Sequence, residues 1–79
     1  MQVTPEQARQ WLMGSKQSNV EMPKMIKYAT RLMNGEWNPK LMFNSPVIIR
    51  KGYVRDGHHR LFAILLADMP AECNVRIDE

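Results

Sequence analysis

The residues most able to do chemistry stand together in the run Asp56-Gly57-His58-His59-Arg60, between an extended segment and an apolar helix. A helix start leaves about four backbone N–H groups without partners, and these donors and the helix dipole attract phosphate. Gly57 permits a positive φ and a close backbone approach. Arg60 can fork onto two phosphate oxygens, and a histidine can donate, accept or titrate near neutral pH. The run therefore predicts an anion site.

Asp56 and the two histidines also have a purely structural interpretation. Asp56 can cap the helix, and either histidine can simply hydrogen-bond a backbone carbonyl. Arg60 is harder to explain in this way, because a cation in the first helical turn is unfavourable unless an anion lies nearby. That cost is the strongest local argument for a ligand.

Metal binding and thiol chemistry are not favoured by the residue types present. Structural zinc takes four Cys or His ligands at characteristic spacings, whereas this chain has two adjacent histidines and one distant cysteine, Cys73. Cys73 falls in an expected strand, with no basic neighbour before Arg76, so it is a poor candidate for a nucleophile. The seven methionines stand mostly at apolar helix positions and are expected in the core. We therefore expect no metal site formed by the protein alone.

Length and composition predict one small soluble domain over residues 1–79. A chain this short buries only about 60–65% of the surface that its unfolded form exposes. A single cysteine cannot form an internal disulfide, which fits a reducing compartment. The opening residues do not resemble a leader, and no apolar run reaches the 18 or so residues that a membrane span needs. We therefore expect a cytoplasmic protein with no membrane contact.

Positive charge is concentrated in the first part of the chain. Residues 1–55 contain nine Lys or Arg against three Asp or Glu. Such a surface attracts nucleotides or nucleic acid, and aromatic residues between cations can stack bases; here Trp37, Phe43 and Tyr53 are near the cations in sequence. The alternative is a solvated helix face together with core aromatics. The cations that would form a nucleic-acid surface are Lys24, Lys27, Arg31, Arg50, Lys51 and Arg55.

Two helices are expected before residue 36. Residues 4–7, Thr-Pro-Glu-Gln, have a cap, a proline at the first helical position and a capping-box partner, and they predict a helix over residues 5–13. The second helix is expected to open at Ser18 or Asn19, to hold Pro23 in its first turn and to end at Asn34-Gly35. Its apolar residues share one face at helical spacing: Met22, Met25, Ile26, Ala29, Leu32 and Met33.

The remaining segments complete an α+β domain. Residues 36–45 are expected to form a connection, and residues 46–50 and 53–55 a β-hairpin around Lys51-Gly52. Residues 61–67 predict a helix that ends before Pro70, and the alternation in residues 73–77 predicts a final strand. The expected order is two N-terminal helices, a β-hairpin, a helix and a final strand.

Residues 46–77, PVIIRKGYVRDGHHRLFAILLADMPAECNVRI, resemble the core of the ParB/sulfiredoxin-like superfamily. Its signature is a proline-led strand, a turn, a second strand, an Asp-Gly-x-x-Arg-x-x-Ala box that opens a helix, and a last strand. Gly57, Arg60 and Ala63 match the spacing of this box. Residues 28–37, YATRLMNGEW, are similar to the helix ending in Gly-x-Trp that precedes this core in small phage and mobile-element members. The resemblance covers roughly residues 20–77.

The resemblance implies a nucleotide, CTP, ATP or ADP, whose phosphates lie on the box, with Mg²⁺ as the accompanying ion. Gly57 and Arg60 carry over as phosphate contacts. His59 replaces an arginine of CTP-binding members, and His59 with Arg60 matches the pair that contacts ATP phosphates in sulfiredoxin. His58 stands at the sulfiredoxin cysteine position, which excludes sulfinate reduction. It also replaces the acidic residue linked to hydrolysis in CTP-binding members. In this chain, His58 is still a candidate phosphate contact.

Two functions follow as hypotheses. The first is a stand-alone nucleotide-binding domain, without the helix-turn-helix domain of partition proteins, in which Asp56, His58 and His59 are the candidates for catalysing hydrolysis or kinase-like phosphotransfer. Related free-serine kinases have a similar box, in which the counterpart of Asp56 would act on a hydroxyl or on Mg²⁺. The second is a non-enzymatic phage or mobile-element module that contacts DNA or a host protein through its basic surface. A homodimer formed through exposed Met and aromatic residues is compatible with either function.

Overall fold

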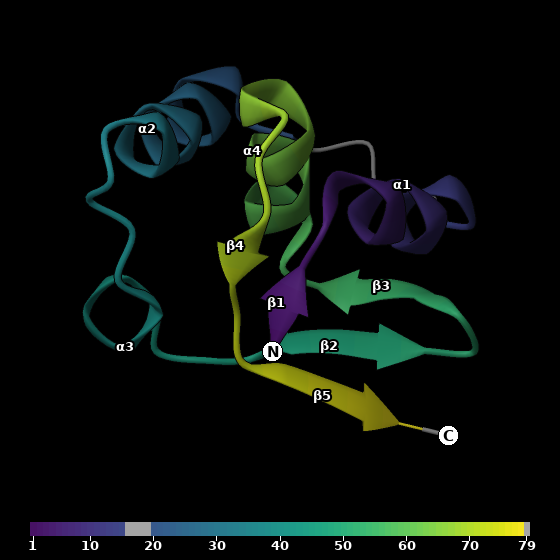
Figure 1. The fold of residues 1–79 in the computed structure, drawn as a ribbon. Helices are drawn as coiled ribbons and strands as arrows, with labels where there is room; N and C mark the ends of the chain where they lie inside the picture. Colours follow the sequence, from purple (N-terminus) through teal and green to yellow (C-terminus); the bar gives the residue numbers. More distant parts are fainter. Residues whose placement is uncertain (16–19, 79) are drawn as a thin grey trace.

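Helices form a layer above a small mixed sheet in the computed structural model, which describes residues 1–15 and 20–78 (Figure 1). The central strand β2 (Val47–Arg50) pairs antiparallel with β3 (Tyr53–Asp56) and parallel with β5 (Val75–Asp78). Two further short strands, β1 (Gln2–Val3) and β4 (Ala71–Glu72), pair antiparallel with each other. This arrangement confirms the predicted α+β class, although β1 and β4 were not expected.

The helix α4 (His58–Ala67) lies between α1 (Pro5–Met13) and α2 (Met22–Met33) and packs against both. A short helix, α3 (Pro39–Met42), lies to one side of the sheet, below α2 in Figure 1. The segment predicted as an irregular connection therefore contains one helical turn. Its position matters because the residues that follow α3 run back towards the first turn of α4.

Short-range signals place the ends of the first two helices. Thr4 Oγ1 accepts a hydrogen bond from the Gln7 N–H at 3.2 Å, which confirms the predicted cap of α1. In α2, Pro23 lies in the first turn as expected, and the N-cap position is Glu21. The predicted caps Ser18 and Asn19 lie outside the described residues.

The hairpin β2–β3 turns through Lys51 and Gly52, whose φ angles are 56° and 86°. Two successive residues with positive φ make the tight turn that matches the twist of antiparallel strands. The pairing then shifts by one residue between Ile48 and Ile49, because Ile48 opposes Asp56 whereas Ile49 opposes Val54. This irregularity at the end of β3 lies directly before the Asp-Gly-His-His-Arg run.

Helix α4 begins at His58, three residues earlier than predicted. Its N-cap position is Gly57, with φ of 105°, and no side chain caps the helix. Asp56 is the last residue of β3, so the prediction that Asp56 caps the helix is wrong. The earlier start places both histidines and Arg60 in the first helical turn.

The apolar face predicted for α2 is only partly buried. Met25, Ala29 and Leu32 are buried, whereas Met22, Ile26 and Met33 are exposed. The expectation that the methionines lie in the core is therefore wrong for most of them.

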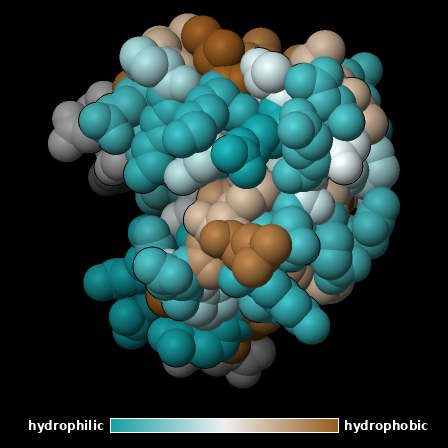
Figure 2. Space-filling view, turned by 90° about the vertical axis from the view of Figure 1, so that its left-hand side faces the viewer, coloured by the Kyte–Doolittle hydropathy of each residue, from teal (hydrophilic) through white to brown (hydrophobic). Residues whose placement is uncertain are grey.

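The side of the molecule on which α2 and α3 lie is mostly hydrophilic around a smaller apolar area (Figure 2). Across the described ranges, no helix is both long enough and apolar enough to cross a bilayer.

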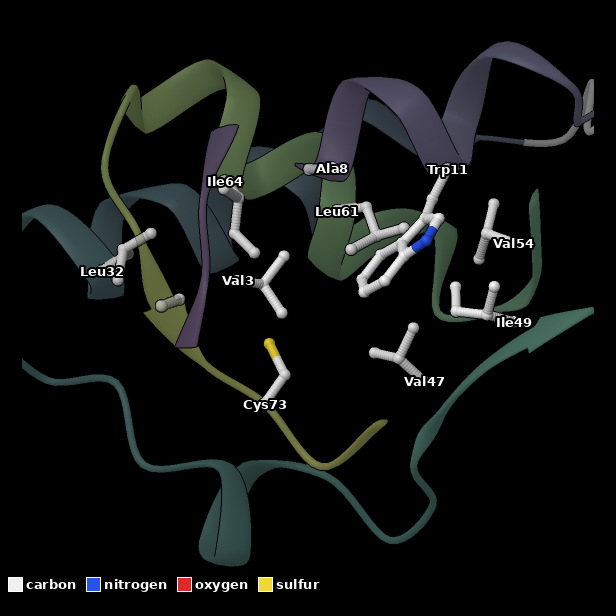
Figure 3. Close-up of a cluster of buried hydrophobic side chains, with 11 residues drawn as sticks. Val3, Ala8, Trp11, Leu32, Val47, Ile49, Val54, Leu61, Ile64 and Cys73 are labelled. Atoms are coloured by element: carbon white, nitrogen blue, oxygen red, sulfur yellow. The ribbon is translucent and has the colours of Figure 1, made fainter. Parts of the chain in front are cut away.

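The core lies between the helix layer and the sheets (Figure 3). Leu61 and Ile64 of α4 are fully buried and face residues of the sheet and of α1. Cys73 is buried too, but it lies between β4 and β5 rather than inside the predicted strand. The other members of this cluster are Val3, Ala8, Trp11, Leu32, Val47, Ile49, Val54 and Ala71.

Candidate phosphate-binding site

A cavity of about 440 Å³ opens at the first turn of α4. The strand-to-helix junction forms one wall, α2 a second, and the segment after α3 a third. The structure therefore brings all five residues of the run 56–60 into one lining and adds residues that are far away in sequence. The lining residues are Lys24, Tyr28, Met42, Phe43, Asn44, Ser45, Asp56, Gly57, His58, His59 and Arg60.

Gly57 allows β3 to turn directly into α4. Its φ of 105° is a conformation that side-chain-bearing residues rarely adopt. A Cβ atom at this position would lie 2.9 Å from Cγ2 of Val47 in the core. A glycine is therefore required at this position for two reasons: the positive φ of the backbone, and the close packing of the junction on β2.

Arg60 is the only buried charged side chain among the described residues, with 7% of its surface exposed. Its Nη1 donates a hydrogen bond to the Ser45 carbonyl at 2.7 Å. The guanidinium carbon lies 4.6 Å from the centre of the Phe43 ring, which is a cation–π distance. These two contacts fix the guanidinium against the segment after α3, at the wall of the cavity.

The positive charge of Arg60 has no carboxylate beside it. Within the described ranges, no acidic oxygen lies within 4.0 Å of its guanidinium. Burial lowers the pKa of Arg60, and the more distant charge of Asp56 opposes this shift. A guanidinium stays protonated at any ordinary pH. The cavity therefore contains a desolvated cation in an unfavourable position at a helix N-terminus, which an anion would stabilise.

Three aromatic rings support this wall of the cavity. The Tyr28 and Phe43 rings meet edge to face with their centres 5.1 Å apart, and the Trp37 and Phe43 centres are 5.2 Å apart. Trp37 Nε1 also donates to the Glu72 carbonyl at 2.8 Å. Trp37 and Phe43, predicted as base-stacking candidates, thus belong to one half-buried cluster that positions Arg60.

His58 faces both the cavity and the end of α1. Its Nε2 lies 2.7 Å from Oγ of Ser15. Burial lowers the pKa of His58 below its usual value of 6.5, against the charge of Asp56, and His59 lowers it further. His58 is therefore mainly neutral at pH 7, and it can exchange a proton with a hydroxyl group or a ligand.

This lowered pKa predicts that acid weakens the fold through His58. Below pH 6.5 the unfolded chain binds a proton that the folded protein does not, so the free energy of unfolding falls as the pH drops towards the folded-state pKa. The slope from one group is at most about 1.4 kcal/mol per pH unit. Denaturant unfolding between pH 7.5 and 5 should show a steeper loss of stability in the wild type than in His58→Gln, with the difference below this maximum because solvent screens a partly exposed ring. An equal slope in both proteins would contradict the assignment.

His59 has a structural partner. Its Nε2 accepts a hydrogen bond from the Glu21 N–H at 2.9 Å, at the N-cap position of α2. The hypothesis that one histidine is structural thus gains support, although the partner is an amide rather than a carbonyl. Only Nδ1 of His59 is left for a ligand, so the phosphate-contact and catalytic roles expected of this residue have one ring nitrogen to use.

The six cations expected on a nucleic-acid surface do not form one surface. Lys24 lines the cavity, and Lys27 and Arg31 follow it along α2. Arg50 and Lys51 lie at the hairpin turn, on the opposite side of the molecule in Figure 1, and Arg55 is exposed on β3. Tyr53, the third predicted stacking residue, lies against Gly14.

The structure bears on the remaining chemical candidates as well. Burial raises the pKa of the Cys73 thiol to about 11, which agrees with its rejection as a nucleophile. In the part of the chain that the structure describes, no group of three or more His, Cys, Asp or Glu residues is placed to hold a metal ion.

Comparison of the chain with protein-family models, with curated proteins and with solved structures found no match.

Sequence reasoning missed the residues that other elements bring to the box. Ser15, Tyr28 and Ser45 contact or line the site from the end of α1, from α2 and from the segment after α3. The contact from Ser45 is made by its backbone carbonyl, which no residue pattern can indicate. Tyr28 stands four residues after Lys24, so helical spacing alone could have placed the two side by side.

Proposed function

We propose that this protein binds the phosphate groups of a nucleotide in the cavity at the first turn of α4. The observation that carries the proposal is Arg60, a buried guanidinium in the cavity wall whose only hydrogen bond among the described residues goes to a neutral carbonyl. A phosphate oxygen pair is the geometric complement of the free edge of a guanidinium. The backbone N–H groups of the helix start would complete the contacts.

The dimensions and charge of the cavity agree with a small phosphorylated ligand. Small-molecule sites usually have volumes of about 300–1,000 Å³, and this cavity has about 440 Å³. Lys24 adds a second cation to the lining, and Asp56 adds a carboxylate. Mg²⁺ usually binds through one or two carboxylates together with substrate phosphates. Asp56 is therefore the residue that would hold Mg²⁺ when a nucleotide is bound.

The order of elements around the box also supports the proposal. Two strands joined by a turn, a helix that opens at the box, and a last strand follow one another, which is the order that the resemblance to the ParB/sulfiredoxin-like superfamily implies. Under this proposal Gly57 and Arg60 contact phosphates. His58, neutral and beside a hydroxyl, is the group available to move a proton if hydrolysis or phosphotransfer occurs.

Calorimetric titration tests the proposal. CTP, ATP, ADP and GTP, each with and without Mg²⁺, should include at least one saturable binder, and inorganic triphosphate should compete with it. The corresponding nucleoside should bind much more weakly, because it lacks the groups that Arg60 attracts. Release of phosphate in the same samples would report turnover. No binding of any nucleotide to the folded protein, or equal binding of nucleoside and nucleotide, would refute the proposal.

A further inference from the structure

A second cavity of about 280 Å³ adjoins the first. Tyr28 and Met42 belong to the lining of both, so the two cavities share a wall formed by α2 and the end of α3. The second cavity adds Lys27, Arg31 and Leu41 to that lining, and it includes no acidic residue. A second, positively charged depression therefore lies beside the proposed phosphate site.

The sequence of α2 explains why cations line both cavities. Lys24, Lys27, Tyr28 and Arg31 are spaced i, i+3, i+4 and i+7, which places them on one face of the helix. Lys24 lines the first cavity and Arg31 the second, about 10 Å further along the helix axis. Neither Lys27 nor Arg31 forms an ion pair with any described residue. A single phosphate group is too small to contact both ends of this row.

We propose that the preferred ligand is a single-stranded nucleic acid with a terminal phosphate. The terminal phosphate would lie on Arg60, and the following backbone phosphates on Lys27 and Arg31. A phosphate within a strand carries a nucleotide on each side, whereas a terminal phosphate can enter the cavity that holds a side chain only 7% exposed. This inference rests on the proposed function and specifies its ligand.

The shared wall offers apolar surface to the first bases. Tyr28 is half-buried between the two cavities, and Leu41 is 84% exposed at the edge of the second. Aromatic and aliphatic side chains between cations are the pattern with which proteins bind single strands without sequence preference. The same side of the molecule is hydrophilic around a small apolar area (Figure 2). A nucleic-acid strand combines these features, since it alternates charged phosphates with flat bases.

Fluorescence anisotropy with short oligothymidylates tests the inference. Strands with a 5′-phosphate, with a 3′-phosphate and with neither are compared, and thymidine monophosphate and triphosphate serve as competitors. We expect one phosphorylated strand to bind about tenfold more tightly than the monophosphate at low salt, and the strand without a terminal phosphate to bind weakly. Lys27→Ala/Arg31→Ala should remove this gain and leave the affinity for the triphosphate unchanged.

Salt dependence and a matched variant make the test specific. Each phosphate contact to a single strand contributes about −0.7 to the slope of log K against log salt, so the double variant should lose about 1.4 from that slope. Arg50→Ala/Lys51→Ala removes the same charge at the hairpin turn and should bind as the wild type does. Arg60→Met should weaken both the strand and the triphosphate.

The possible failures are distinguishable. Triphosphate binding that depends on Arg60, with no gain for the phosphorylated strand, would overturn this inference and leave the proposed function standing. Equal binding of strands with and without a terminal phosphate, or equal loss in the hairpin variant, would also overturn it. An acidic peptide that competes as well as the strand would assign the depression to a protein partner instead. Failure of both strand and triphosphate to bind would refute the proposed function itself.

Discussion

Replacing Arg60 with methionine is expected to weaken phosphate binding strongly and to leave the fold intact. Methionine fills a similar volume without charge, so the variant loses the group that would pair with phosphate. Removing one partner of a buried, hydrogen-bonded charge pair costs about 2–5 kcal/mol, which is an affinity loss of roughly 30-fold or more. Calorimetry with the best nucleotide found for the wild type measures this loss.

Stability should change in a different direction from affinity. In the free protein the Arg60 charge is buried with only the Ser45 carbonyl and the Phe43 ring as partners. Replacing a poorly compensated buried charge with an apolar side chain is often neutral or stabilising. The free energy of unfolding of Arg60→Met should therefore stay within about 1 kcal/mol of the wild-type value or rise.

Two further variants serve as comparisons for Arg60→Met. Arg60→Lys keeps the positive charge but loses the planar pair of N–H donors of the guanidinium. This variant should bind phosphate with an affinity between those of the wild type and Arg60→Met. Arg9→Met removes an exposed cation on α1, outside the cavity, and should bind as the wild type does. If Arg60→Met were strongly destabilised while the wild type bound no phosphate, Arg60 would be a structural tie for the segment after α3.

Gly57→Ala is expected to destabilise the protein more than any other single glycine replacement in the described chain. An alanine at a φ of 105° is strained by about 1–2 kcal/mol. The new Cβ would also lie 2.9 Å from Val47 Cγ2, and overpacking of this kind costs about 1–3 kcal/mol. The sum, about 2–5 kcal/mol, should lower the Tm by more than about 8 °C in a domain of this size.

Gly52→Ala is the matched control for backbone strain. Gly52 has a φ of 86°, but a Cβ there meets nothing within 4 Å. The difference between the two variants isolates the contact with Val47. In the background of Val47→Ala, which removes both methyl groups and keeps only the Cβ at 3.2 Å, Gly57→Ala should cost clearly less than in the wild-type background. Equal costs for both glycines in the wild-type background would show that the junction is looser than described.

Much of the fold could be predicted because its signals are local. Thr4 with Pro5 starts α1, and Lys51-Gly52 turns the hairpin as expected. The apolar residues predict the helix only from residue 61, whereas α4 begins at His58. Asp56 is a good capping residue by type. The glycine after it takes the N-cap position instead, since only glycine fits so close to Val47.

The site itself could be predicted only in part. The run 56–60 identified one wall of the cavity, but the other walls come from α2 and from the segment after α3. The burial of Arg60 depends on Phe43 and on the Ser45 carbonyl, which are brought to it by tertiary packing rather than by spacing. Similarly, the exposure of Met22 and Met33 could not be predicted, because helical periodicity shows that a face is apolar and not whether anything covers it.

The most direct measurement is a titration of the isotope-labelled protein with inorganic triphosphate, followed by NMR. The account predicts that the largest shifts occur at the backbone amides of residues 57–61 and at the Arg60 side-chain Nε. The amides of Lys51 and Gly52 at the hairpin turn should stay unchanged. Shifts confined to the hairpin turn, or none at the first turn of α4 while triphosphate binds, would contradict the claim that phosphate lies on Arg60.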